Sequence, residues 1–266
     1  KPHVDARDGV WRGDFLPGGP GGSLADRQGW LRSYRSRMLP LADLAASAGA
    51  DQLVIGTELV HLSADPELVV LWRDLIRDIR SRYKGSLTYA ANWGRQDGEY
   101  RRIPFWDALD SIGVNGYFPL TRKPNPGYAD ISSGWRSFVH EDGTRSSWIA
   151  EIDGLRKQTG KPVMLTEIGY PSSVTGAARP WDYQQLEQVD LRIQSLAYSA
   201  ALSAWSATPW LTGIYWWAWG VSPTDGGTGD AGFSPQGKPA LGVLVRWYQT
   251  AAGGRCRPLE AASLGQ

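Results

Sequence analysis

Several features that define other classes of protein are scarce in this sequence. Its 266 residues contain a single cysteine, Cys256, which excludes an intrachain disulfide and a thiolate metal site. The formal net charge is only +1, so the chain has neither a basic footprint for nucleic acid nor an acidic excess. No apolar run approaches the length that spans a membrane. We therefore expect a globular protein, a monomer, with no nucleic-acid partner and no membrane partner.

The sequence also lacks a recognisable beginning. It opens on Lys1 without a methionine, a basic region or an apolar signal segment. Residues 1–5 have the pattern of a strand end, so we expect that part of the fold precedes them. The compartment stays open, because a secreted bacterial protein can do without disulfides. A secreted or periplasmic location is the favoured expectation.

Tryptophan, in contrast, is abundant, with 14 residues. Flat, rigid aromatic rings stack on the C–H faces of sugars at little cost in side-chain entropy, as they do at interfaces. Large hydrophobic cores also use tryptophan. Composition alone leaves sugar binding and core packing about equal.

Short apolar runs alternate with helical patterns along the chain. Strands are expected at residues 51–59, 86–93, 111–118, 163–167 and 211–219, and helices at residues 23–48, 65–83, 148–158, 182–207 and 239–248. Such alternation is typical of βαβ units around a parallel sheet. With residues 1–5 counted as a strand end, the chain has six units, two fewer than a closed eight-stranded barrel.

This pattern predicts an α/β fold, a (β/α)8 TIM barrel in which the given chain starts near strand 3. The predicted catalytic domain covers residues 1–250, with the first two βα units absent from the given sequence, and residues 251–266 form a C-terminal tail. Neither a phosphate-binding glycine motif nor a serine-hydrolase elbow interrupts the pattern. Nucleotide-binding and serine-hydrolase functions are therefore not indicated.

Two of the expected strands end in a carboxylate with a threonine before it, Thr57-Glu58 and Thr166-Glu167. In an α/β barrel both side chains would stand at the carboxyl-end rim, where catalysis occurs. A pair of carboxylates flanking one bond is what glycoside hydrolysis needs. The alternative is a structural ion pair at each site, but no Lys or Arg is adjacent in the sequence to either glutamate. The catalytic interpretation is favoured.

Four motifs resemble glycoside hydrolase family 113 in matching order: Ile-Gly-Thr-Glu-Leu at 55–59, Val-Asn-Gly-Tyr-Phe-Pro-Leu at 114–120, Leu-Thr-Glu-Ile-Gly-Tyr at 165–170 and Tyr-Trp-Trp-Ala-Trp at 215–219. The resemblance runs from residue 1 to about residue 248. It implies a retaining clan A barrel of the β-mannanase type. Glu58 would be the general acid/base at the end of strand four, and Glu167 the nucleophile at the end of strand seven.

The chain departs from the clan pattern at two places. Thr57 stands where the clan usually has Asn, the residue that would hydrogen-bond the substrate 2-hydroxyl. The clan also places an Arg from strand two near the nucleophile, in the part absent from this sequence.

Aromatic side chains near the expected strand ends are candidates for positioning and binding. Tyr117 could donate its phenol to Glu167, or could simply pack in the core. Trp217 and Trp219 would share one strand face by the period of two and form a sugar platform, with Trp216 opposite. Both are predicted to bind substrate.

Three further residues, His3, Asn92 and Trp93, lie at other expected strand ends and are predicted to hold sugar hydroxyls. The spacing His3-x-Asp5-x-x-Asp8 could suggest a metal site, but no second histidine is near. We expect no metal and no cofactor.

Together these observations predict a retaining glycoside hydrolase that cleaves β-1,4-mannosidic linkages in mannan or manno-oligosaccharides by double displacement. The partner is then an oligosaccharide or polysaccharide substrate. Glu58 should have a raised pKa, so that it donates a proton to the leaving oxygen. The alternatives are a non-catalytic carbohydrate-binding barrel, a retaining hydrolase of another β-glycan such as xylan or glucan, and a structural barrel.

Overall fold

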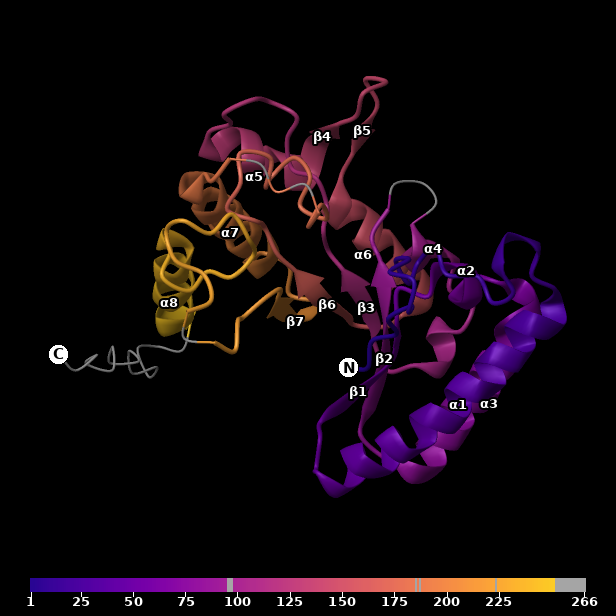
Figure 1. Cartoon of the computed structure of the whole chain (residues 1–266). Coiled ribbons are helices and arrows are strands. Elements are labelled where there is room, and N and C mark those ends of the chain that lie inside the picture. The colour runs from indigo at the N-terminus through magenta and orange to yellow at the C-terminus, as the bar shows by residue number, and fades with distance from the viewer. Residues whose placement is uncertain (95–97, 185, 187, 223, 252–266) are drawn as a thin grey trace. The chain divides into compact units, whose positions relative to one another are not determined.

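A computed structural model describes residues 1–94, 98–184, 186, 188–222 and 224–251. These residues form two compact units (Figure 1). The first unit comprises Lys1–Gly116, Glu151–Ile168 and Trp210–Tyr215. The second comprises Tyr117–Ala150, Gly169–Pro209 and Trp216–Gln266. The two units are described separately below. Most of the tail predicted at residues 251–266, with Cys256, lies outside the described residues.

A sheet of five strands in the order β1-β2-β3-β6-β7 organises the first unit (Figure 1). Its strands are β1 (Gln52–Thr57), β2 (Ser86–Asn92), β3 (Ile112–Asn115), β6 (Val163–Ile168) and β7 (Leu211–Trp216). The pairs β1–β2, β2–β3 and β3–β6 are parallel. Nearly every residue of β1, β2 and β3 is buried, as expected for a parallel sheet that is covered on both faces. The carboxyl ends of these strands meet at one edge.

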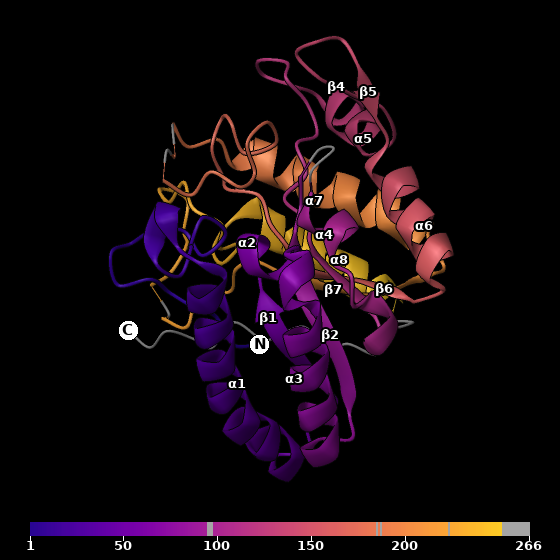
Figure 2. The same cartoon turned by 90° about the vertical axis from the view of Figure 1, so that its right-hand side faces the viewer.

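Two long helices, α1 (Leu24–Ser47) and α3 (Val69–Arg82), lie side by side next to β1 and β2 (Figure 2). Ser23 begins α1 with a capping box, in which its side chain and that of Asp26 each accept the other's backbone N–H. Apolar residues at helical spacing give α3 a buried face that includes Trp72, which stacks on Phe105. The α/β alternation predicted from periodicity is therefore present in this unit.

Short helical elements complete the first unit. They are η1 (Gly19–Gly21), α2 (Val60–Ser63), η2 (Pro66–Leu68), α4 (Glu99–Arg102), η3 (Trp106–Ala108) and most of α6 (Trp148–Thr159), which begins in the second unit. The helices α2 and α4 are a single turn each, and they follow the carboxyl ends of β1 and β2 in the chain. They therefore supply side chains close to the edge where those strands end.

The second unit is mainly helical. It contains α5 (Tyr128–Ser137), α7 (Leu191–Ser206) and α8 (Pro239–Ala251), and α7 packs against both of the others. A small antiparallel hairpin, β4 (Phe138–Val139) with β5 (Arg145–Ser146), follows α5. Among the described residues of both units, no helix combines the length and apolar character needed to cross a bilayer.

Several boundaries differ from the sequence predictions. The strand expected at residues 111–118 ends at Asn115, so Tyr117 lies beyond it. Residues 1–5, expected to be a strand end, are irregular. The helix expected from residue 182 begins only at Leu191, because Asp190 caps it by accepting the N–H groups of Arg192 and Ile193. The last strand, expected to reach residue 219, ends at Trp216. Tertiary contacts and capping, which periodicity does not report, decide these limits.

Candidate active site

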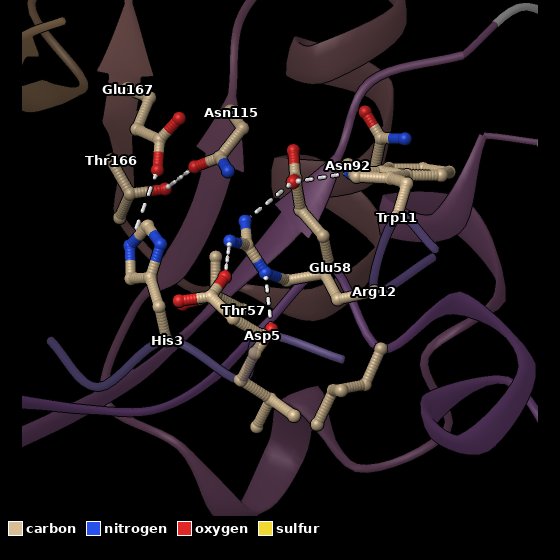
Figure 3. Close-up of polar contacts among 12 residues, drawn as sticks. His3, Asp5, Trp11, Arg12, Thr57, Glu58, Asn92, Asn115, Thr166 and Glu167 are labelled. Carbon is tan, nitrogen blue, oxygen red and sulfur yellow. Dashed lines mark hydrogen bonds and ion pairs between the residues drawn. The ribbon is translucent and has the colours of Figure 1, made fainter. Parts of the chain in front are cut away.

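Glu58 and Glu167 lie where two parallel strands of the first unit end. Glu58 directly follows β1, and Glu167 is the second-last residue of β6. Each is only 6% exposed. Asn115, at the end of β3, is the register partner of Glu167, and Figure 3 shows it between the two glutamates. The sheet thus brings together two carboxylates that are far apart in the sequence, as predicted.

The backbone of Glu58 adopts an unusual conformation. Its φ is +50°, in the left-handed region that non-glycine residues rarely occupy. Its N–H donates to the carbonyl of Ala90 at 2.9 Å. The N–H of the next residue, Leu59, donates to the hydroxyl of Tyr89 at 2.7 Å. Such a conformation persists where the surroundings hold it, and it is found at functional sites more than elsewhere.

Basic side chains contact Glu167. The ammonium of Lys1 pairs with Glu167 Oε1 and also donates to the carbonyl of Thr166 at 3.3 Å. The Nε2 atom of His3 lies 3.7 Å from the same carboxylate oxygen. The predicted site residue His3 is thus placed beside a glutamate. No basic residue adjoins either glutamate in the sequence, but the fold brings Lys1 and His3 to Glu167.

A second basic group contacts Glu58. Arg12 Nη1 lies 3.4 Å from Glu58 Oε2, and the indole N–H of Trp11 donates to the same oxygen at 3.3 Å. Arg12 is held in turn by the carbonyl of Val4, and by the carboxylate of Asp5 as Figure 3 shows. The sequence reasoning missed Lys1, Trp11 and Arg12, since these residues meet the glutamates only through the tertiary fold.

Burial raises the pKa of Glu58, and the nearby charge of Glu167 raises this pKa further. The amide of Asn115 and the charges of Arg12 and Lys1 oppose the rise. The result is a carboxyl group that holds its proton to higher pH than an exposed glutamate, as predicted for a general acid.

Burial, with the charges of Lys1 and Arg12, lowers the pKa of His3. This favours a neutral imidazole beside Glu167 at neutral pH. A neutral ring can donate one hydrogen bond and accept another, which suits contact with hydroxyl groups.

Asn115 completes the centre of the site. Its Oδ1 accepts the hydroxyl proton of Thr166 at 2.9 Å, which fixes the orientation of the amide. Its Nδ2 is fully buried and makes no hydrogen bond of standard geometry with the described residues, although it faces Glu58 closely enough to affect that residue's pKa. A buried amide donor of this kind is available to a ligand atom. The sequence reasoning did not single out Asn115.

The other predicted site residues fall into two groups. Asn92 ends β2 and Trp93 follows it, both half-buried and in the same unit as the glutamates. Tyr117, Trp217 and Trp219 belong to the second unit. Tyr117 is 8% exposed, whereas Trp217 and Trp219 are 40% and 55% exposed. The roles of all five in substrate binding stay predictions.

The strand-alternation argument for the two tryptophans is wrong, because β7 ends at Trp216 and residues 217 and 219 lie beyond it. For a metal, the described residues contain no group of three His, Cys, Asp or Glu side chains suited to hold one.

A buried pair of carboxylates, one with a raised pKa, at the carboxyl ends of parallel strands is an arrangement that suits a glycosidase built on an α/β barrel. A model of one family, Glycoside Hydrolase Family 113, matches residues 1–238. The chain belongs to this family, as its motifs indicated. A comparison with curated proteins finds no match.

Solved structures agree with this assignment. The chain is similar to the GH113 β-mannanase AaManA from Alicyclobacillus acidocaldarius in complex with ManMIm, with 28% identity and a TM-score of 0.76 over 94% of this chain and 72% of that one. A GH113 β-1,4-mannanase matches with 25% identity and a TM-score of 0.73 over the same shares. The β-glucuronidase of Faecalibacterium prausnitzii shares the fold, with 14% identity and a TM-score of 0.56 over 82% of this chain and 35% of its own. The TIM-barrel fold class predicted from the sequence is confirmed.

Proposed function

We propose that this protein is a retaining β-mannanase that cleaves β-1,4-mannosidic linkages in mannan or manno-oligosaccharides. The observation that carries the proposal is the pair of buried glutamates at the ends of β1 and β6, with the pKa of Glu58 raised by burial and by the charge of Glu167. Membership of the family, and the β-mannanases among the similar structures, support the choice of substrate.

The reaction proceeds in two displacements. Glu167 attacks the anomeric carbon while Glu58 gives its proton to the glycosidic oxygen, so the bond to the leaving sugar breaks and a glycosyl-enzyme forms. Glu58, now ionised, takes a proton from water, and that water attacks the anomeric carbon. The bond to Glu167 breaks, and the product leaves with the configuration of the substrate.

The surrounding residues have distinct tasks in this scheme. Lys1 and His3 hold Glu167 in place through its Oε1, and Lys1 balances its charge. Arg12 and Trp11 contact Glu58 and stabilise the ionised form that acts as base in the second step. The Nδ2 of Asn115, between the two glutamates, donates to a substrate hydroxyl.

Further sugar contacts are assigned to Asn92 and Trp93, and to Tyr117, Trp217 and Trp219, whose aromatic faces suit sugar rings. The catalytic domain spans residues 1–250. These substrate-binding residues and domain bounds are part of the proposal, which starts from the pair of glutamates.

The decisive test measures reducing-sugar release from β-mannan, xylan and cellulose by the wild-type protein, by Glu167→Ala and by Glu58→Ala. A matched control is Glu141→Ala, because the Glu141 side chain is 86% exposed. We expect activity on mannan that is retained in the control and falls by at least about 10³-fold in the two site variants.

Other outcomes would change the proposal in different ways. Turnover of xylan alone would overturn the choice of mannan and leave the mechanism standing. Binding of manno-oligosaccharides by calorimetry, without any product, would favour the non-catalytic barrel. NMR of the first product anomer checks retention, and an inverted anomer would exclude Glu167 as nucleophile.

A further inference from the structure

A buried carboxylate in the first unit, Glu99, takes no part in the mechanism above. It begins the single-turn helix α4 and is 1% exposed. Three groups donate hydrogen bonds to it: Ser63 Oγ at 2.5 Å and Tyr89 OH at 2.6 Å to Oε1, and the N–H of Asn92 at 2.6 Å to Oε2. Burying a carboxylate costs free energy unless it is hydrogen-bonded. The three bonds donated to Glu99 offset this cost and hold the side chain in one position.

The network extends from Glu99 to the backbone of the acid/base residue. The hydroxyl of Tyr89 donates a hydrogen bond to Glu99 and accepts one from the N–H of Leu59, the residue after Glu58, at 2.7 Å. On the other side, the N–H of Glu58 is held by Ala90 at 2.9 Å. The left-handed turn at Glu58 is therefore fixed at both of its peptide groups, one through a strand bond and one through Tyr89.

We propose that Tyr89 and Glu99 are positioning residues that hold Glu58 in its left-handed backbone conformation and so aim its carboxyl group for proton transfer. The proposal rests on the acid/base role assigned to Glu58 above. Through Oε2, Glu99 also fixes the N–H of Asn92 at the end of β2, so one carboxylate ties together the ends of two neighbouring strands.

The packing around Tyr89 supports a role in which small displacements matter. The ring is fully buried and lies edge-on to Trp72 and Phe105, with centroids 5.8 and 6.0 Å apart. The ring of Tyr89 lies against Gly56, where an added Cβ would be only 2.7 Å from Tyr89 Cε2. A side chain at position 56 would push the ring aside. The absence of one keeps the hydroxyl within reach of Leu59 and Glu99.

The role has a kinetic signature. A misplaced general acid slows the departure of a poor leaving group, whereas a strongly activated leaving group departs without a proton. Tyr89→Phe removes the acceptor for Leu59 N–H, so the variant should discriminate between the two kinds of substrate. A merely structural residue, in contrast, would lower both rates together when its loss reduces the folded fraction.

The experiment measures kcat/KM for a manno-oligosaccharide and for a dinitrophenyl β-mannoside with Tyr89→Phe and with Glu58→Ala. The matched control is Tyr34→Phe, since Tyr34 is also buried and its hydroxyl also bonds the backbone, donating to the carbonyl of Ile55 in β1. For Tyr89→Phe we expect a loss of about 10–100-fold on the oligosaccharide and less than about 3-fold on the aryl glycoside. Tyr34→Phe should retain the wild-type ratio of the two.

Each other outcome overturns the proposal, and the cause can be told apart. Selective loss in Glu58→Ala but an equal loss, or none, in Tyr89→Phe would refute the positioning role alone. An equal loss in Glu58→Ala would refute the acid/base role and with it the proposal. Should Tyr89→Phe not fold by circular dichroism, Ser63→Ala takes its place, because it removes one partner of Glu99 and leaves Tyr89 intact. A selective loss of about 3–10-fold is then expected, and its absence would refute the proposal.

Discussion

At the scale of single residues, opposing influences act on the proton of Glu58. Burial and Glu167 raise its pKa, while Asn115, Arg12 and Lys1 lower it. The acid must be protonated in the first step and ionised in the second. A pKa that is too low would leave Glu58 without its proton in the first step, and one that is too high would keep it from acting as a base in the second. The balance between burial and the neighbouring cations sets the pH range of activity.

Arg12→Gln is expected to shift that range. Without the guanidinium 3.4 Å from Glu58 Oε2, one of the opposing charges is gone and the pKa of Glu58 rises. Glu58 then keeps its proton to higher pH, so the alkaline limb of the kcat/KM profile moves upward. The control is Arg73→Gln, which breaks an exposed pair with Asp107. A downward shift, or the same shift in the control, would contradict the role of Arg12.

Asn115→Ala is a second residue-scale prediction. The substitution removes the partner of Thr166 and the buried amide between the glutamates. A hydrogen bond to a substrate hydroxyl contributes on the order of 1–3 kcal/mol, so kcat/KM on manno-oligosaccharides should fall by about 10–100-fold. Asn125→Ala, in an exposed loop with φ +46°, is the control for loss of an asparagine. Unchanged kinetics in Asn115→Ala would show that its amide meets no substrate.

At the scale of elements, the one-turn helices α2 and α4 connect the ends of β1 and β2 through Ser63 and Glu99. They are too short to be stable by themselves. Their side chains add a link between two strand ends that the parallel ladder already pairs at Thr57 and Ala90. The local fold at this edge of the sheet therefore depends on a buried carboxylate rather than on helix propensity.

This dependence predicts a pH effect on stability. Burial raises the pKa of Glu99 from 4.5 to about 7. The folded state therefore binds the proton more tightly than the unfolded state. The stability this gives is fully present below about pH 4.5 and is lost as the pH rises through 7, by up to about 3 kcal/mol.

Glu99→Gln has no such proton to lose, so chemical denaturation at pH 4.5 and 7.5 is the measurement. The free energy of unfolding of the wild type should fall relative to that of the variant over this interval. Glu58 titrates in both proteins, so most of its contribution cancels in the comparison, and what remains is its coulombic interaction with Glu99. A constant difference between the two proteins would mean that Glu99 does not titrate in this range.

At the scale of the whole molecule, a ligand that binds only the folded state stabilises it by mass action. Manno-oligosaccharide at about 100 times its Kd should therefore stabilise Glu167→Ala, which cannot turn it over, by about 2.7 kcal/mol. Thermal unfolding measures this shift, with a cello-oligosaccharide as the control. An equal shift with both sugars would contradict selectivity for mannose.

Much of the architecture could be predicted from the sequence, because its signals are local. Apolar runs such as residues 163–165 mark buried strands, and the cap at Ser23 and the spacing in α3 mark helices. The two strand-end glutamates are visible for the same reason. A Thr-Glu pair at the end of an apolar run can be found twice in the sequence without knowing the fold, and the family motifs include both pairs.

Only the tertiary structure decided which groups meet those glutamates. Lys1 is 166 positions from Glu167, and Arg12 is 46 positions from Glu58, so no periodicity could pair them. The peptide after Glu58 is likewise held over a long range, because Leu59 N–H donates to Tyr89, which in turn donates to Glu99. The local sequence pattern by itself was enough to place the strands and to single out the two glutamates at their ends. The proton affinity and aim of Glu58 required long-range contacts, because burial and neighbouring charge exist only once the chain has folded.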